Sequence, residues 1–298
     1  MSKQEISTKF PFESKFIEVY NSKIHYIEEG SGDPILFLHG NPSSSYIWRN
    51  IIPYMTSKGL CIAPDLIGMG KSDKPDLKYS FFDHVKYVEG FIEKKNLRNI
   101  TLVIHDWGSA LGFHYAMRNE KNIKGIAFME GIIKPLTWDL LSEGVAKYFK
   151  LVRNPELGKE LIINQNILIE RILPTTMIRV LTEEEYNFYS SPFKDPASRK
   201  PLLRFPNEVP IEGEPEDVSA AVQSYKEKLK ESNLPKLMFH ANPGSIVTPE
   251  LIEWCKKNLP NLTTVDIGPG THFLQEDNPH LIGEEIAKWY DGILPEEA

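Results

Sequence analysis

Asp106 occupies a place in the sequence where a carboxylate could act as a nucleophile. Residues 100–104 before it form a short apolar run, typical of a strand buried on both faces. Residues 108–112 after it are mostly small, which favours a helix packed tightly on that strand. A side chain at such a strand-to-helix bend stands at the carboxyl edge of a sheet, as in a nucleophile elbow with aspartate in place of serine. The pattern departs from G-x-S-x-G at Ile104 but keeps its second glycine at Gly108, and the simpler alternative is that Asp106 only caps the helix.

Two further side chains could complete an acid–base system with this carboxylate. His272 follows the last predicted strand in a glycine-rich loop, and Glu130 ends the strand that comes directly after the bend. An imidazole can act as a general base, and a carboxylate can orient it and stabilise its charged form. The loop at residues 242–249, where many α/β-hydrolases carry this acid, contains no carboxylate, so we assign that part to Glu130. The order nucleophile, acid, histidine is that of the α/β-hydrolases. The alternatives are that His272 caps a helix or loop, and that Glu130 caps the next helix.

The elements that must position these groups alternate between strands and helices along most of the chain. This alternation predicts a mostly parallel central sheet flanked by helices, with right-handed crossovers. Polar groups at the strand ends then collect at one edge of the sheet, where ligands bind in such folds. The predicted strands are 15–26 (a hairpin turning at 21–22), 35–38, 60–65, 100–104, 123–130, 234–241 and 261–267, and the predicted helices are 43–55, 81–95 and 214–231, with others starting at Pro249 and Pro279.

Residues 131–213 interrupt the alternation and are predicted to form a helical cap inserted into the α/β domain. No buried strand is expected there, and apolar residues recur at helical spacing in the segments 138–152, 158–173 and 182–189. The third segment opens with Thr182 and Glu185, the pattern of a capping box. From 192 to 210 the chain has too many prolines to favour regular structure. The predicted division is a core of residues 1–130 and 214–298 around a cap of residues 131–213.

Composition narrows the classes of partner and location. The chain has 298 residues and a formal net charge of −7, which argues against nucleic acid or an anionic membrane as the main partner. Cys61 and Cys255 lie in apolar stretches, which indicates buried thiols and a reducing compartment. The N-terminal segment has no signal-peptide pattern, and no apolar run reaches the ~20 residues of a membrane span. We therefore expect a cytoplasmic protein, a monomer or weak homodimer, with no metal-ligand spacing and no complete phosphate-binding loop.

Five short motifs together resemble the haloalkane dehalogenases, in the subfamily that has glutamate after the sixth strand. The motifs are His39-Gly-Asn-Pro42, residues 64–72, His105-Asp-Trp-Gly108, residues 127–130 and residues 271–277. The resemblance covers nearly the whole chain and implies a cofactor-independent hydrolase. Its substrate would be a small apolar halogenated alkane, and its products an alcohol, a halide ion and a proton.

The resemblance also implies a role for each residue of the site. Asp106 would be the nucleophile that forms a covalent alkyl ester, His272 the base that activates water, and Glu130 the acid that orients the base. Asn41 and Trp107 would donate hydrogen bonds to the leaving halide. The cap should supply an apolar, largely desolvated pocket. Its candidate wall residues are Phe149, Leu168, Ile172, Phe205, Ile246 and Phe273.

Three other functions share parts of this pattern. An epoxide hydrolase would use the same aspartate, histidine and acid, but it needs cap tyrosines, for which Tyr148, Tyr186 and Tyr189 are available. Asn41 disfavours it, because an aromatic residue is usual there. A coelenterazine-type luciferase is built on the same fold, although Pro42 and the N-terminal segment look more like the dehalogenases. A ligand-binding protein is the third, since the fold alone does not determine function.

Overall fold

Eight strands form one sheet in this computed structural model, which describes residues 5–293; the outermost residues of the predicted core therefore lie outside the description. The spatial order is β1-β2-β4-β3-β5-β6-β7-β8, in which β3 to β8 run parallel while β2 is antiparallel to β1 and β4. The mostly parallel sheet that the sequence predicted is thereby confirmed. The strands are β1 (Lys15–Val19), β2 (Ser22–Glu29), β3 (Pro34–Leu38), β4 (Leu60–Pro64), β5 (Ile100–Asp106), β6 (Ile123–Gly131), β7 (Lys236–Pro243) and β8 (Leu262–Gly270).

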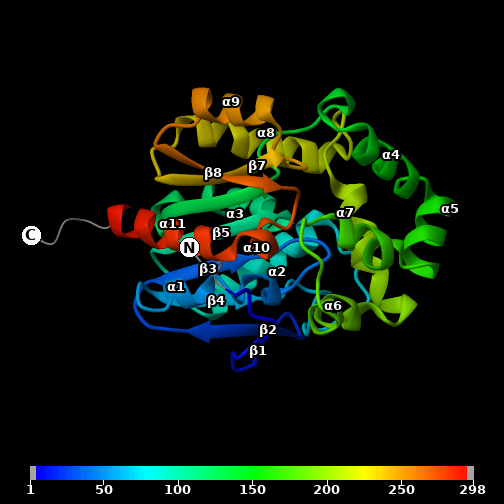
Figure 1. Ribbon diagram of the computed structural model, residues 1–298, viewed down its shortest axis with the longest axis horizontal. Helices are drawn as coiled ribbons and strands as arrows, with labels where there is room; N and C mark the ends of the chain where they lie inside the picture. The colour runs from blue at the N-terminus through cyan, green and yellow to red at the C-terminus, as the bar shows by residue number, and fades with distance from the viewer. Residues whose placement is uncertain (1–4, 294–298) are drawn as a thin grey trace, which may run out of the picture.

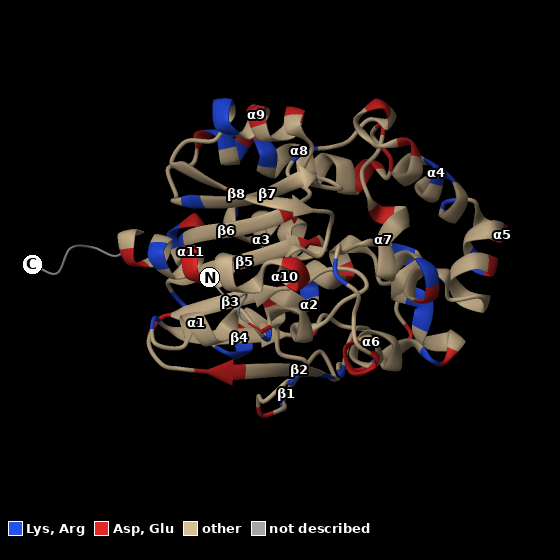
Figure 2. Cartoon of the chain, viewed as in Figure 1, with Lys and Arg blue, Asp and Glu red and all other residues tan. Residues whose placement is uncertain are grey.

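Helices cover both faces of the sheet (Figure 1). One core cluster joins α2, α3, α8 and α9 to one face, and a second joins α1 and α11 to the other. Figure 2 shows the charged residues mainly on the helices around the sheet, with Lys and Arg interspersed with Asp and Glu. The core helices are α1 (Ile52–Met55), α2 (Phe81–Lys94), α3 (Trp107–Ala116), α8 (Glu216–Glu231), α9 (Pro249–Asn258), α10 (Leu274–Asp277) and α11 (Pro279–Ile293).

Strand β5 lies in the middle of the sheet because every one of its residues can be buried. Ile100, Leu102 and Ile104 point into one core cluster and Val103 into the other, as the twofold alternation of a strand requires. The parallel neighbours β3 and β6 then hold its carboxyl end in register beside their own. The residue at that end, Asp106, is therefore held by the most buried part of the fold.

A helical segment lies between β6 and α8, at the end of the sheet where β5 ends (Figure 1). The capping box at Thr182 and Glu185 is present, with each side chain bonded to the other's backbone N–H. Apart from isolated bridges of Ile211 with Leu136 and Glu214, no strand pairing occurs in this segment, as the sequence predicted. Its α-helices are α4 (Glu143–Val152), α5 (Pro155–Gly158), α6 (Glu183–Ser190) and α7 (Lys200–Glu208).

The prediction that residues 192–210 lack regular structure was wrong, because α7 runs from Lys200 to Glu208. Pro201 lies in the first turn, where no helical partner for its missing N–H is needed. Pro206 lies inside the helix, but the buried side chains of Leu202 and Phe205 anchor this stretch to the core. Tertiary packing thus outweighs the unfavourable propensity of the prolines.

Three predicted boundaries also moved, each for a local backbone reason. The hairpin turns at Tyr20 and Asn21, one residue earlier than predicted, and both have the positive φ that a tight hairpin turn requires. The predicted helix 43–55 is split into Ser45–Trp48 and α1, because Pro53 can stand only in the first turn of a new helix. The predicted helix 158–173 becomes two π-helical turns, Lys159–Asn164 and Leu168–Ile172. Asn166 separates them at φ 54°.

No helix within residues 5–293 is both long and apolar enough to cross a membrane.

Candidate active site

Asp106 is the last residue of β5, and α3 begins at the next residue, Trp107. The chain therefore bends sharply at Asp106. Its φ of 49° and ψ of −126° lie in a region that a non-glycine residue adopts only under constraint from its surroundings. Gly108 makes this bend possible, since a Cβ there would lie 2.1 Å from the Leu38 carbonyl oxygen. Ile104, the departure from the glycine pattern, packs instead against Gly112, where a Cβ would lie 2.9 Å from its Cγ2. The small residue at this contact between strand and helix is therefore Gly112 of the helix, whereas the G-x-S-x-G pattern places a glycine in the strand.

The Asp106 side chain makes none of the hydrogen bonds that cap a helix end. Its Oδ2 accepts a hydrogen bond of 2.7 Å from the backbone N–H of Asn41, and the carboxylate also accepts one from the backbone N–H of Trp107. Gly40 leaves room for this approach, because a Cβ there would lie 2.2 Å from Oδ2. Burial raises the pKa of Asp106, and the nearby imidazole of His272 together with the two N–H groups offsets only part of that rise.

His272 lies between the two carboxylates. Its Nε2 is 3.9 Å from Asp106 Oδ1, and its Nδ1 is 3.4 Å from Glu130 Oε2. Burial by itself lowers the pKa of His272, but the hydrogen bond with Glu130 and the charges of both carboxylates outweigh it, so the net pKa is raised. The backbone N–H of His272 donates to the Thr176 carbonyl at 3.0 Å, and its carbonyl oxygen lies 2.9 Å from His105 Nε2. Both the ring and the backbone of His272 are therefore held.

Glu130 is fully buried at the end of β6. It binds the loop between β7 and α9, in which the sequence has no carboxylate. Its Oε2 accepts hydrogen bonds from the backbone N–H groups of Ser245 at 3.0 Å and Ile246 at 2.7 Å. The first α-helix of the inserted segment is capped by Ser142 instead, which removes the alternative that Glu130 caps it. One carboxylate thus ties the β7–α9 loop to the imidazole.

Asp106 and His272 line an apolar cavity of about 160 Å³ between the core and the helical segment, and Glu130 lies behind the imidazole, outside the cavity wall. Asn41 and Trp107 line it beside Asp106 and His272. Four of the predicted wall residues, Phe149, Leu168, Ile172 and Ile246, also line it. The wall residues that sequence reasoning missed come largely from the helical segment: Ile132, Leu136, Leu141, Val145, Tyr148, Thr176, Pro206 and Val209, together with Pro42 and Ser245 of the core.

Phe205 and Phe273, which we expected in the wall, lie behind it. Phe205 stacks on His84 with ring centroids 4.4 Å apart and packs against the Trp107 ring at 5.3 Å. Phe273 stacks on Tyr189 at 5.9 Å and is fully buried. Both rings pack behind residues of the cavity wall, and the side that each ring faces is decided by the packing of its segment and not by residue type. The missed positions 145 and 148 on α4 share one helix face with the predicted position 149, and that spacing is the signal that could have found them.

The sequence and the fold of this chain are similar to those of known proteins. A family model described as alpha/beta hydrolase fold matches residues 33–279. A haloalkane dehalogenase of Mesorhizobium japonicum is 44% identical and aligns with 93% of this chain and 91% of its own length. One of Bradyrhizobium diazoefficiens is 42% identical over 97% of both chains. The crystal structure of haloalkane dehalogenase DbeA from Bradyrhizobium elkani has a TM-score of 0.93 and 41% identity, covering 95% of this chain and 98% of that one.

The chain belongs to the haloalkane dehalogenase family. Its α/β-hydrolase fold follows from the same comparisons.

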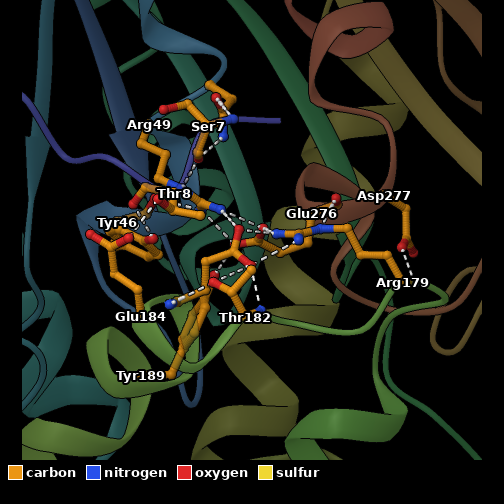
Figure 3. A network of polar contacts seen from close by, with 12 residues as sticks. Ser7, Thr8, Tyr46, Arg49, Arg179, Thr182, Glu184, Tyr189, Glu276 and Asp277 are labelled. Atoms are coloured by element: carbon orange, nitrogen blue, oxygen red, sulfur yellow. Dashed lines mark hydrogen bonds and ion pairs between the residues drawn. The ribbon is translucent and has the colours of Figure 1, made fainter. Parts of the chain in front are cut away.

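In this member of the haloalkane dehalogenase family, a buried ion cluster joins the helical segment to the core (Figure 3). The cluster consists of Arg49 and Glu276 from the core and Arg179 and Glu185 from the helical segment. Arg49 bonds Glu276 through both terminal nitrogens, at 2.6 and 2.8 Å, and Glu185 at 2.8 Å. Arg179 bonds Glu185 at 2.9 and 2.5 Å and also contacts Glu276. Two positive and two negative charges therefore compensate one another, with Arg49, Glu185 and Glu276 buried and Arg179 partly exposed.

The same contact region carries the backbone of the histidine loop. Thr176 accepts hydrogen bonds from the N–H groups of His272 at 3.0 Å and Phe273 at 2.7 Å. A few residues further along both segments, Asp277 accepts from the N–H groups of Ile178 and Arg179, each at 2.9 Å. The helical segment therefore holds the loop on which His272 stands.

Replacing Glu276 with glutamine should destabilise the protein by about 3–5 kcal/mol, because it leaves buried guanidinium charge without its partner. Burial raises the pKa of Glu276, but Arg49 and Arg179 outweigh it and lower the net pKa. A lowered folded pKa means that this stabilisation is present above the unfolded pKa and is lost as pH falls, so the variant should also lose part of the wild type's acid sensitivity. Chemical unfolding at pH 7 and at pH 4, which is below the ordinary pKa of a glutamate, measures both effects.

The matched control is Glu227→Gln, whose carboxylate pairs with Lys230 at 2.7 Å on the surface. That substitution should leave the unfolding midpoint almost unchanged. Equal midpoints for the two variants would contradict the assignment of a stabilising role to the buried cluster.

Proposed function

We propose that this protein hydrolyses the carbon–halogen bond of small haloalkanes through a covalent ester on Asp106. The observation that carries the proposal is the placement of the Asp106 carboxylate at an apolar cavity, with His272 Nε2 3.9 Å away and Glu130 behind the imidazole at 3.4 Å. The expected products are an alcohol, a halide ion and a proton. Asp106, His272 and Glu130 act as nucleophile, base and orienting acid.

In the first step, a carboxylate oxygen displaces the halide at a saturated carbon. Oδ2 accepts the Asn41 N–H, which leaves Oδ1, on the side of His272, as the attacking oxygen. A new bond forms between Oδ1 and the carbon, and the halide leaves with the electron pair of the broken bond. The amide of Asn41 and the indole N–H of Trp107 line the cavity and donate to that halide. Aspartate suits this chemistry because its ester can be hydrolysed, whereas serine would form a stable ether.

In the second step, water attacks the carbonyl carbon of the ester and His272 Nε2 takes its proton. The developing oxyanion is Oδ2, which is held by the backbone N–H of Asn41. The ester bond then breaks, and the alcohol leaves with a proton from the imidazolium. The carboxylic acid that remains on Asp106 loses its proton to solvent, which regenerates the carboxylate and supplies the proton among the products. The charge of Asp106, which raises the pKa of His272, disappears when the ester forms. The loss of that charge lowers the pKa of His272 at the stage at which it must act as a base.

Halide release from 1-bromobutane and 1,2-dibromoethane, followed with a halide-sensitive assay, tests this function. The cavity volume is close to the about 150 Å³ that holds a benzene molecule, so we expect the best substrates to have about four to six carbons. Diol formation from epoxides without halide release would favour an epoxide hydrolase. Light emission with coelenterazine would favour a luciferase, and tight binding without turnover a binding protein.

The epoxide alternative has one cap tyrosine to draw on. Tyr186 donates to Glu170 and Tyr189 to Glu276, so neither hydroxyl is directed at the cavity. Tyr148 alone of the three lines it. Asn41, the residue that disfavoured this reaction in the sequence, lies beside Asp106.

Glu130→Gln should lower kcat by about 10²–10⁴, because the neutral amide neither stabilises the imidazolium nor fixes the ring. Glu130 contributes to the raised pKa of His272, so the acid limb of the kcat–pH profile should move to lower pH in the variant. Steady-state halide release between pH 5 and 9 measures both changes. Glu253→Gln, on the exposed side of α9, is the matched control. An acid limb that stays in place or rises would contradict this role.

We further propose that residues 131–213 form the cap over a core of residues 1–130 and 214–298. The cavity lined from both parts supports this division.

Both cysteines are free and buried, which supports a reducing, cytoplasmic location. A monomer or weak homodimer is the expected state, and size-exclusion chromatography with light scattering tests it.

A further inference from the structure

Tyr148 on α4 carries a buried hydroxyl with no hydrogen-bond partner among residues 5–293. Its ring lines the cavity together with Val145 and Phe149 of the same helix face. Buried polar groups in folded proteins are nearly always paired, because leaving one unpaired costs free energy that a phenylalanine would not. A ligand in this cavity that accepts a hydrogen bond would therefore supply the missing partner of the Tyr148 hydroxyl.

The mechanism proposed above does not use this hydroxyl. Asp106, His272, Asn41 and Trp107 account for the polar groups that the two steps require. Among the wall residues of the cap, only Tyr148 and Thr176 have polar side chains. The Thr176 hydroxyl already donates to the Leu173 carbonyl at 2.7 Å. Within the described residues, the cap side of the cavity thus has one hydroxyl whose proton no protein group accepts. This hydroxyl belongs to Tyr148.

The electrostatic surroundings keep that proton on the oxygen. Burial, and to a smaller degree the charge of Asp106, raises the pKa of Tyr148, so the phenol stays neutral and acts as a donor. The same charge of Asp106 disfavours an anionic ligand in this apolar space. The fitting partner is a neutral acceptor atom.

We propose that the Tyr148 hydroxyl donates a hydrogen bond to a neutral acceptor on the substrate chain, so that the cavity favours haloalkanes bearing an ether, carbonyl or nitrile group over plain alkyl halides of equal size. This inference rests on the proposed dehalogenase function and names the substrate class of the same site. Tyr148 makes no bond to the reacting carbon or the halide in this scheme. It is a specificity-determining residue.

The test compares pairs of substrates that differ by one replacement of CH₂ by oxygen. The pairs are 1-bromobutane with 1-bromo-2-methoxyethane, and 1-bromopentane with 1-bromo-3-methoxypropane, which place the acceptor at two distances from the halogen. For each pair, the ratio of kcat/KM for the ether to that for the alkane is measured in the wild type and in Tyr148→Phe. Intrinsic reactivity differences between ether and alkane cancel when the two enzymes are compared.

Loss of one hydrogen bond should lower this ratio about 3- to 10-fold in Tyr148→Phe for at least one pair, while kcat/KM for the alkanes stays equal or rises. Tyr186→Phe is the matched control, since its hydroxyl bonds Glu170 outside the cavity, and its ratios should equal those of the wild type. A purely structural role for Tyr148 would change both members of a pair alike.

Ratios unchanged in Tyr148→Phe for both pairs would overturn the proposal. Should Tyr148→Phe unfold, Tyr148→Leu provides the same comparison without the hydroxyl. Failure of the wild type to release bromide from any of the four substrates would instead refute the proposed function, so the two failures are distinguishable.

Discussion

A His272→Phe enzyme is expected to react once with a haloalkane and then stop, with the alkyl group still attached to Asp106. Displacement of the halide requires only the carboxylate, whereas hydrolysis of the ester requires a base that phenylalanine cannot supply. Halide should therefore appear as a burst of about one equivalent per chain, after which steady release falls by roughly four orders of magnitude. Mass spectrometry of the intact protein, and of the peptide containing Asp106, should show the added alkyl group.

The reaction should be run near pH 8, for a reason visible in the site. The imidazole of His272 lowers the pKa of Asp106 against the larger effect of burial, so its removal lets that pKa rise further. At acidic pH the nucleophile of the variant would be protonated and the burst would be missed. The double variant His272→Phe, Asp106→Ala is the control and should acquire no mass. An unmodified Asp106 peptide after a measured halide burst would contradict the ester intermediate.

Asp106→Ala should lower kcat by about 10⁴-fold or more, since no other carboxylate can attack from the same place. Glu130 Oε2 accepts hydrogen bonds from the backbone N–H groups of Ser245 and Ile246, and the carboxylate lies on the far side of the imidazole. Steady-state halide release with 1-bromobutane measures the loss. Substantial residual turnover would mean that water attacks the haloalkane directly and that the ester is not on the path.

The same variant should not be less stable at neutral pH, which separates lost chemistry from lost folding. A carboxyl group whose folded pKa is raised destabilises the folded state at a pH above its unfolded pKa, because the buried charge is then present. Removing it relieves that cost, although the N–H groups of Asn41 and Trp107 lose their acceptor. An unfolding midpoint at or above that of the wild type is expected. A lower midpoint would indicate that Asp106 contributes to folding more than to the site alone.

The positions of the site along the chain could be predicted because they depend on local pattern. An apolar run that ends in Asp106 and is followed by glycine-rich sequence can hardly form anything other than a strand, a bend and a helix. Parallel strands have their carboxyl ends at one edge, so the ends of β5, β6 and β8 had to bring Asp106, Glu130 and the loop of His272 near one another. The structure places the three groups in contact range.

The cap was less predictable, because its conformation depends on packing between segments far apart in the sequence. The helix α7 forms despite Pro206, since Leu202 and Phe205 are buried against the core. Which face of α7 meets the cavity is set by that docking, and it turned Phe205 toward His84 and away from the ligand space. Hydrophobic residues at helical spacing do not by themselves say which of them faces a neighbour and which faces a void.

The sequence by itself determined the order of the strands, the bend at Asp106 and the set of groups able to attack, orient and accept a proton. These features follow from backbone geometry and residue type over short distances. Only the tertiary structure decided the cavity wall, the unpaired hydroxyl of Tyr148 and the four-charge cluster around Arg49. Each of these requires side chains from distant segments to meet, and the free energy of such contacts depends on burial and partner geometry that no local pattern contains.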